Sequence, residues 1–172
     1  MSGEQFSQHG SISLNGINIT KFNPNQRRKI GLLSAPEERL GHAAAPNMSL
    51  IENTLITAEN SQNLVSRGFI DWKKSKAFAE KVIKKFDVRT PGSQNTAGSL
   101  SGGNLQKFVI GREILQNPSV FIVNQPTWGV DAAAASSIRQ ALLTLSENGA
   151  AILVISQAVS YTHLTLPTSH CV

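Results

Sequence analysis

The stretch SLSGGNLQKFVIGREILQNPSVFIVNQPTWGVD, residues 99–131, is the most informative part of this sequence. A glycine-rich turn opens directly into a helical apolar pattern at 105–115, which ends near Asn117-Pro118. A β-rich run at 120–123 follows. Glycines let the backbone approach a ligand closely, and the free N–H groups at a helix start attract anions. The order favours a phosphate-binding turn, although a Ser-Gly-Gly turn taken alone is more often only a turn.

The C-terminal half alternates between strand and helix patterns. The β-rich runs 120–123 and 151–155 flank a helical pattern from about 132 to 147. A strand, helix, strand order implies a parallel pair joined by a crossover helix. We therefore expect an α/β fold with a helical insertion ahead of this unit.

The N-terminal segments show a hairpin and a short strand. GSISLNGINIT, residues 10–20, alternates apolar and polar residues around an Asn-Gly pair, which is typical of a β-hairpin. The apolar run 30–34 precedes a proline and three charged residues, so a strand should end there at a polar loop. Loops at strand ends often face a ligand.

Two helix starts follow from capping chemistry. Ser49 and Glu52 have the spacing of a capping box, and Asp71 can cap the next helix. On a wheel of residues 72–86, the apolar side chains share one arc: Trp72, Phe78, Ala79, Val82, Ile83 and Phe86. Six lysines fill the opposite arc, which favours a solvated helix face over a nucleic-acid surface.

Composition sets further bounds. The chain has 172 residues, 40% of them hydrophobic, and a net charge of +5. Its longest apolar runs are far shorter than the ~20 residues that a bilayer span needs, and no signal-peptide pattern opens the chain. A single cysteine, Cys171, fits a reducing compartment. We expect one soluble, cytoplasmic domain.

The motifs together resemble a known family. Residues 99–131 resemble the signature-to-D-loop region of ATP-binding cassette (ABC) ATPases, most closely the second nucleotide-binding domain of the fused ATPase subunits of sugar and nucleoside importers. The resemblance covers residues 1–157, with a helical signature subdomain at about 48–117. It implies an α/β, partial P-loop NTPase cassette.

The resemblance assigns the glycine-rich turn. Its residues match the family's signature: Leu100, Ser101, Gly102, Gly103 and Asn104. In the family this turn contacts the γ-phosphate of ATP held by the opposing cassette. These residues are therefore expected to complete a partner's nucleotide site.

The residues that would serve this cassette's own nucleotide depart from the family pattern. Asn124 stands where an acid supports Mg²⁺, and its amide lacks the charge that attracts a hard cation. Glu37 stands at the Q-loop glutamine position. The resemblance makes it a candidate metal contact, and a loop salt bridge is an equal alternative.

Two further amides stand at catalytic positions. Gln125 replaces the glutamate that polarises the attacking water, and Gln157 replaces the switch histidine. General-base catalysis contributes about 10²–10⁴-fold, so this half-site is expected to be slow, although a glutamine can still orient water. His9, His42 and His163 are expected to be surface residues that do not restore the chemistry.

Asp131 has two possible roles. Gly129, Val130 and Asp131 match the D-loop, which crosses the dimer interface in the family. Asp131 also precedes an alanine-rich helix, where it can act simply as the N-cap. Both roles are compatible with the sequence.

Both ends of the chain depart from the family. No G-x-x-x-x-G-K-[ST] phosphate loop (Walker A) occurs in the 172 residues, although the family places one shortly before the segment that begins here. Residues 158–172 match no family element and resemble translated adapter sequence. We therefore expect a truncated cassette with a foreign tail, unable to hydrolyse ATP by itself.

The leading hypothesis is a fragment of an importer ATPase that uses ATP and Mg²⁺. Its expected partners are the first cassette of the same subunit, transmembrane permease subunits and, indirectly, a periplasmic or lipoprotein solute-binding protein. It would lie on the inner face of the cell membrane and bind no nucleic acid. The alternatives are a non-catalytic interaction domain and an ABC ATPase of the DNA-repair type; the latter lacks support because both Walker B acids and long coiled-coil or zinc insertions are missing.

Overall fold

The computed structural model describes residue 3 and residues 9–157 of the chain. The tail predicted at 158–172, including His163 and Cys171, lies outside the described residues.

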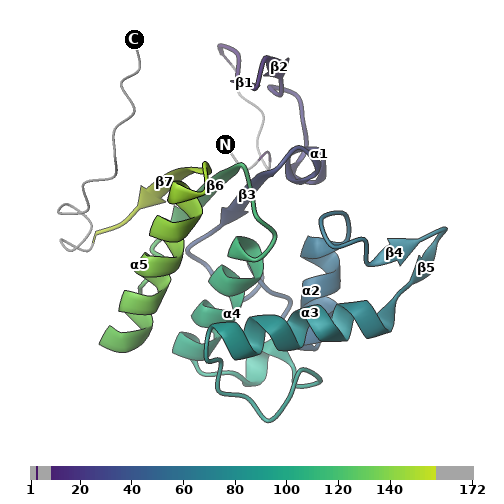
Figure 1. Cartoon of the computed structure of the whole chain (residues 1–172), viewed down its shortest axis with the longest axis vertical. Helices are drawn as coiled ribbons and strands as arrows, with labels where there is room; N and C mark the ends of the chain where they lie inside the picture. The colour runs from purple at the N-terminus through teal and green to yellow at the C-terminus, as the bar shows by residue number, and fades with distance from the viewer. Residues whose placement is uncertain (1–2, 4–8, 158–172) are drawn as a thin grey trace.

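A three-stranded parallel sheet lies above most of the helices in the view of Figure 1. Its order is β3 (Leu32–Ala35), β6 (Val120–Asn124) and β7 (Ala151–Ile155). Helix α5 (Ala132–Glu147) connects β6 to β7, which confirms the predicted crossover. Phe121 and Val123 of the central strand are fully buried, as expected for a parallel strand packed on both faces.

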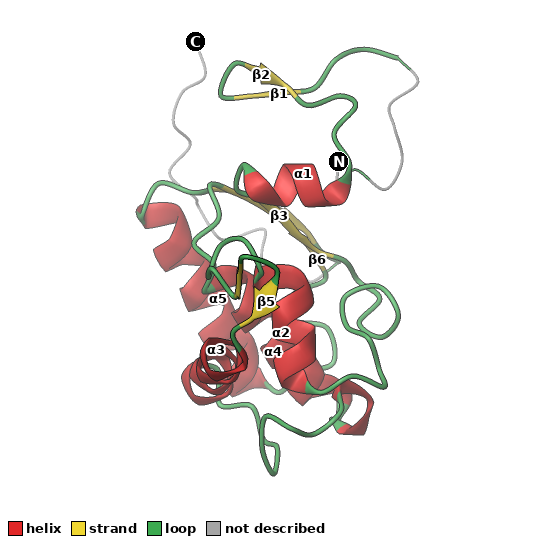
Figure 2. Ribbon diagram, turned by 90° about the vertical axis from the view of Figure 1, so that its right-hand side faces the viewer, coloured by secondary structure: helices red, strands yellow, loops and turns green. Residues whose placement is uncertain are grey.

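The first strand of the sheet starts later than predicted. The prediction placed it at 30–34, but Ile30 caps the C-terminus of α1 (Pro24–Lys29) and Gly31 has φ +86°. Helix α1, which lies beside β3 (Figure 2), was not predicted from the sequence. Its signal was present, because Asn23 and Gln26 form a capping box around Pro24 at the helix start.

Two hairpins project from the helices and the sheet. The predicted hairpin forms from β1 (Ser13–Leu14) and β2 (Ile17–Asn18), with both turn residues at positive φ, as a two-residue turn of this kind requires. A second hairpin, β4 (Val65–Ser66) and β5 (Phe69–Ile70), was not predicted. Its Arg-Gly turn lacks the Asn-Gly or Asp-Gly signal on which short-range prediction depends.

The segment between β3 and β6 is mostly helical. It contains α2 (Leu50–Ala58), α3 (Trp72–Lys85), a short 3-10 turn η1 (Ala97–Ser99) and α4 (Gly102–Ile114). Helix α4 contacts β3, α2, α3 and α5, so it joins the helical layer to the sheet. Its residues 105–114 are all buried, including charged ones. The helix that follows the glycine-rich turn is therefore the centre of the core.

The capping predictions are confirmed. Ser49 and Glu52 form the reciprocal capping box of α2, and Asp71 accepts from the backbone N–H of Lys74 at 2.9 Å. The lysines of α3 are exposed, as predicted for a solvated face.

The predicted buried arc of α3 was wrong at one residue. Trp72 is 53% exposed, whereas Phe78, Ala79 and Val82 lie in the core. Trp72 is the first residue of α3, directly after β5, and lines an open pocket with Ser49 and other polar residues. Among the described residues, the helices are all too short or too polar to cross a membrane.

Candidate functional site

Four polar side chains follow the carboxyl ends of the three parallel strands. Glu37 lies two residues after β3, Asn124 ends β6 and Gln125 follows it, and Gln157 lies two residues after β7. The carboxyl ends of parallel strands meet at one edge of a sheet, where α/β folds bind their ligands. We call these four residues the amide edge.

Glu37 and Asn124 contact each other at this edge. Asn124 donates from Nδ2 to Oε2 of Glu37 at 3.4 Å. The contact with a basic side chain of this loop, which was the alternative predicted for Glu37, is made by the neighbouring Glu38. Its Oε2 lies 3.0 Å from Nδ1 of His42. His42 is an exposed residue, as predicted. The Glu37 carboxylate is therefore engaged by the Asn124 amide.

Gln125 is buried and held in a left-handed backbone conformation, with φ +49°. Its N–H donates to the carbonyl of Ile155 at 2.7 Å. Its Oε1 accepts from Ser156 Oγ at 3.4 Å and from the N–H of Gln157 at 3.3 Å. Positive φ is costly for a residue with a side chain and persists where surrounding contacts impose it. The structure thus brings the two predicted catalytic positions into direct contact.

Gln106 supports the backbone of this turn and was missed by sequence reasoning. Its Nε2 donates to the carbonyls of Gln125 at 3.2 Å and Pro126 at 3.0 Å. The side chain is buried, and its Oε1 has no hydrogen-bond partner within the described part of the chain. The only sequence signal was its place two residues after Asn104, near the start of α4.

The signature turn forms the N-terminus of α4. Ser101 is the N-cap residue but makes no side-chain cap hydrogen bond to the helix. Its Oγ instead accepts from Nδ2 of Asn104 at 2.9 Å, and Oδ1 of Asn104 accepts from the N–H of Arg89 at 2.9 Å. Leu100 packs against the core from the other side. Because the N-cap side chain does not cap α4, the first N–H donors of the helix are left to another acceptor.

A side chain at either glycine of this turn would crowd a neighbouring group within the chain. A Cβ at Gly102 would lie 2.8 Å from Nη1 of Arg39, and one at Gly103 would lie 3.1 Å from the carbonyl oxygen of Gly129. Gly129 itself has φ +65°. The glycines thus allow the predicted signature turn to approach residues 129–131, the predicted D-loop.

Arg39 bridges these two segments and was not predicted. It donates from Nη1 to the carbonyl of Gly102 at 3.0 Å and from Nη2 to the carbonyl of Trp128. Partial burial lowers the pKa of Arg39 below its usual value.

Asp131 is the N-cap of α5, as one of the two predicted roles requires. Its Oδ1 accepts from the N–H of Ala134 at 2.8 Å. This hydrogen bond is the main cause that lowers the pKa of Asp131, and the charge of Lys107 adds to it. The role of Asp131 at a dimer interface stays a prediction.

The amide edge does not fit a magnesium ion held by protein charges. Among the described residues there is no group of three or more His, Cys, Asp or Glu side chains that could hold a metal. Glu37 is the single carboxylate of the edge, and its Oε2 is engaged by Asn124. The N-terminus of α4 does fit a phosphate, because a hydroxyl and uncapped N–H donors meet there.

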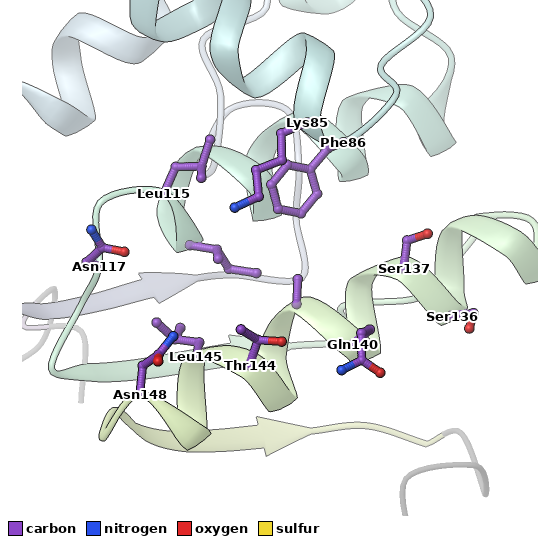
Figure 3. Close-up of a pocket in the computed structure, with 12 residues that line it drawn as sticks. Lys85, Phe86, Leu115, Asn117, Ser136, Ser137, Gln140, Thr144, Leu145 and Asn148 are labelled. Atoms are coloured by element: carbon purple, nitrogen blue, oxygen red, sulfur yellow. The ribbon is translucent and has the colours of Figure 1, made fainter.

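A separate cavity of about 510 Å³ lies between α5 and the ends of α3 and α4 (Figure 3). Lys85, Phe86 and Leu115 form one wall, and Gln140 and Thr144 of α5 form the other. None of the predicted site residues lines this cavity. It is distinct from both the amide edge and the signature turn.

The parallel sheet with a polar strand edge, together with a glycine-rich turn at the start of a helix, is the arrangement typical of nucleotide-binding α/β cassettes. The chain belongs to the ABC transporter family, whose sequence pattern matches residues 1–128. The fold is that of an ABC ATPase cassette, a P-loop NTPase fold. Over 92% of the chain it is similar to 67% of MJ0796, an ATP-binding cassette solved as a dimer with ADP and Pi, at a TM-score of 0.75 and 19% identity.

Curated relatives are similar over most of the chain. The arabinose import ATP-binding protein AraG of Vibrio parahaemolyticus is 36% identical over 90% of this chain and 30% of its own length. The nucleoside import ATP-binding protein NupA of Lactococcus lactis is 37% identical over 86% of this chain and 29% of its own length. The chain therefore spans about 30% of the length of these relatives.

Proposed function

We propose that this chain is an ATP-binding segment of an importer for sugars or nucleosides. The names of its relatives support this class of transported solute. Its partners would be a first cassette of the same subunit, permease subunits in the membrane and, through them, a solute-binding protein. The chain would then act on the cytoplasmic face of the membrane, as one part of a second nucleotide-binding domain.

The uncapped N-terminus of α4 carries this proposal. Ser101 makes no cap hydrogen bond, so its hydroxyl and the N–H groups that follow are placed for a phosphate. The first two helical residues are glycines, which keep that approach open. In this role Leu100 to Asn104 bind the γ-phosphate of ATP held by the other cassette.

The amide edge would form the slower of two nucleotide sites. Neither Asn124 nor Gln125 can carry the negative charge or accept the proton that a fast site needs. The Oε1 of Gln125 is also occupied by hydrogen bonds from Ser156 and Gln157. ATP with Mg²⁺ bound there would serve a structural or regulatory role, within a cassette spanning 1–157 whose helical subdomain covers about 48–117.

The test uses the complete subunit that contains these residues. Replacing Ser101 by Trp fills the phosphate-facing turn, and we expect ATP turnover to fall by about 10²-fold or more, because oriented donors act mainly on the transition state. The control is Ser66→Trp, at an exposed position of β4. Unchanged turnover in Ser101→Trp, with a folded protein, would exclude the proposed role of the signature.

A further inference from the structure

We infer that Arg39 is a positioning residue that holds the signature turn and the D-loop at a fixed spacing and links both to the amide edge. Its importance for ATP turnover rests on the proposed function, whereas its mechanical role can be tested without nucleotide.

The guanidinium group contacts two segments that are distant in sequence. Its donors engage the carbonyl of Gly102, 63 residues away, and the carbonyl of Trp128, 89 residues away. A planar guanidinium has donors fixed in a fork, so both bonds form only when the two carbonyls have the right separation. The Arg39 side chain can therefore make both hydrogen bonds only at one spacing between the signature turn and the D-loop.

Glycines enclose the guanidinium on both sides. A Cβ at Gly102 would lie 2.8 Å from Nη1, and a Cβ at Gly129 would lie 3.2 Å from Nη2. The Arg39 head group thus fills the space that side chains at these positions would occupy. This packing explains why the turn and the loop can approach each other closely here.

Arg39 is also tied to the amide edge through a short piece of backbone. Glu37, two residues before Arg39, accepts a hydrogen bond from Asn124 at the end of β6. Glu38 is the one residue between Glu37 and Arg39, and the side chains of both glutamates are exposed. A change at the Glu37–Asn124 contact therefore moves the segment that carries Arg39, and so reaches the signature turn. In this way a slow site can regulate the turn that serves the partner's nucleotide.

Hydrogen exchange on the 172-residue chain tests the mechanical role. The reporter amides are Leu105, which donates to the carbonyl of Ser101, and Trp128, which donates to the carbonyl of Gln125. Arg39→Lys keeps the charge but loses the fork, so both amides should exchange on the order of tenfold faster, relative to Leu142 in the middle of α5. Arg67→Lys, on the exposed turn between β4 and β5, should leave both rates unchanged.

Because rates are taken relative to Leu142, general loss of stability cannot imitate the result. Acceleration of neither reporter, or of only one, would overturn the positioning role. Glu37→Ala tests the link to the edge, because it removes the acceptor of the Asn124 hydrogen bond: we expect both reporters to accelerate about threefold, in the same direction as in Arg39→Lys. No change in Glu37→Ala would overturn the link.

Turnover of the complete subunit separates this inference from the proposed function. If Ser101→Trp leaves turnover intact while Arg39→Lys loosens both reporters, the proposed function fails and the positioning role stands. If Ser101→Trp abolishes turnover while the reporters in Arg39→Lys stay unchanged, the positioning role fails and the proposed function stands.

Discussion

Asn124, at the end of β6, donates a hydrogen bond to Oε2 of Glu37, at the exit of β3, across 3.4 Å. One amide and one carboxylate thus share the place where a nucleotide hydrolase would gather charge around a metal ion. The contact joins the ends of neighbouring strands of the sheet. Glu37 is the single carboxylate of the amide edge, so the edge offers a metal ion little negative charge. It also places Glu37 at the start of the segment that leads to Arg39.

Asn124→Asp should create a cation site at this edge. Two facing carboxylates repel each other without a metal and attract a hard divalent cation. We expect the affinity for Mn²⁺ to rise by about tenfold or more, measured by calorimetry or by the increase in melting temperature with Mn²⁺. The double variant Asn124→Asp with Glu37→Gln returns the edge to one carboxylate and should lose the gain; a gain that persists would show that Glu37 is not a ligand.

Glu113→Gln should strongly destabilise the fold. Glu113 is 1% exposed and lies between two arginines: its Oε2 contacts Arg28 and its Oε1 lies 2.9 Å from Nε of Arg112. Arg112 is itself buried, and burial is the main cause that lowers its pKa. Removing the charge leaves buried arginine uncompensated, which typically costs about 3–5 kcal/mol.

Urea unfolding provides the measurement for Glu113→Gln. The control is Glu80→Gln, which breaks an exposed pair with Lys76 and should cost at most about 0.5 kcal/mol. Equal effects of the two variants would contradict the view that Glu113 joins α1 to α4 through a buried charge cluster.

Gly111→Ala should destabilise the chain although alanine favours helices. A Cβ at Gly111 would lie 2.4 Å from Cδ2 of the buried Phe86 ring, on the interior side of α4. The helix gains up to ~1 kcal/mol in propensity, whereas overpacking a core costs about 1–3 kcal/mol. We expect a net loss in the free energy of unfolding. Gly92→Ala, where no atom lies within 4 Å of the new Cβ, is the control and should be nearly neutral.

Asp131 should make the N-terminus of α5 sensitive to acid. Its folded-state pKa is lowered from the model-peptide value of 3.8 by the hydrogen bond from Ala134. A depressed pKa means that the stabilising contribution is fully present above that unfolded value and is lost as pH falls through the lower folded value. Asparagine also caps helices but does not titrate.

The comparison of Asp131 with Asp131→Asn isolates this effect. We expect the two proteins to melt at more similar temperatures as pH falls below about 4, because protonation removes the advantage of the carboxylate over the amide. A constant difference in melting temperature from pH 7 to pH 3 would show that the Asp131 charge does not contribute to the cap.

The sequence predicted those features that depend on neighbours along the chain. The capping box at Ser49, the cap at Asp131 and the hairpin at Asn15-Gly16 follow from contacts over two to four residues. The parallel pairing of β6 and β7 followed from the length and pattern of the crossover between them. The ABC resemblance rested on the order of such local motifs.

Features built from distant segments escaped sequence reasoning. The helical wheel of residues 72–86 placed Trp72 on the buried arc, yet its side chain is exposed. A wheel gives the direction of a side chain around the helix axis, but it does not show how far the neighbouring helices extend along that axis. Nor did the sequence pattern reveal the contact between Gln106 and the Gln125 turn, since an amide at the start of a helix has no preferred partner in sequence.

Local pattern was enough to predict a strand, helix, strand unit after a glycine-rich turn, and the family resemblance predicts that amides stand where a fast ATPase needs acids. The packing of the sheet and helices sets what these residues contact: Asn124 contacts Glu37, Gln125 contacts Gln157, and Arg39 joins Gly102 to Trp128. Capping and periodicity act within a few residues, and so they are visible in sequence. Contacts between residues more than 30 positions apart are set by how the sheet and helices pack, which no local pattern specifies.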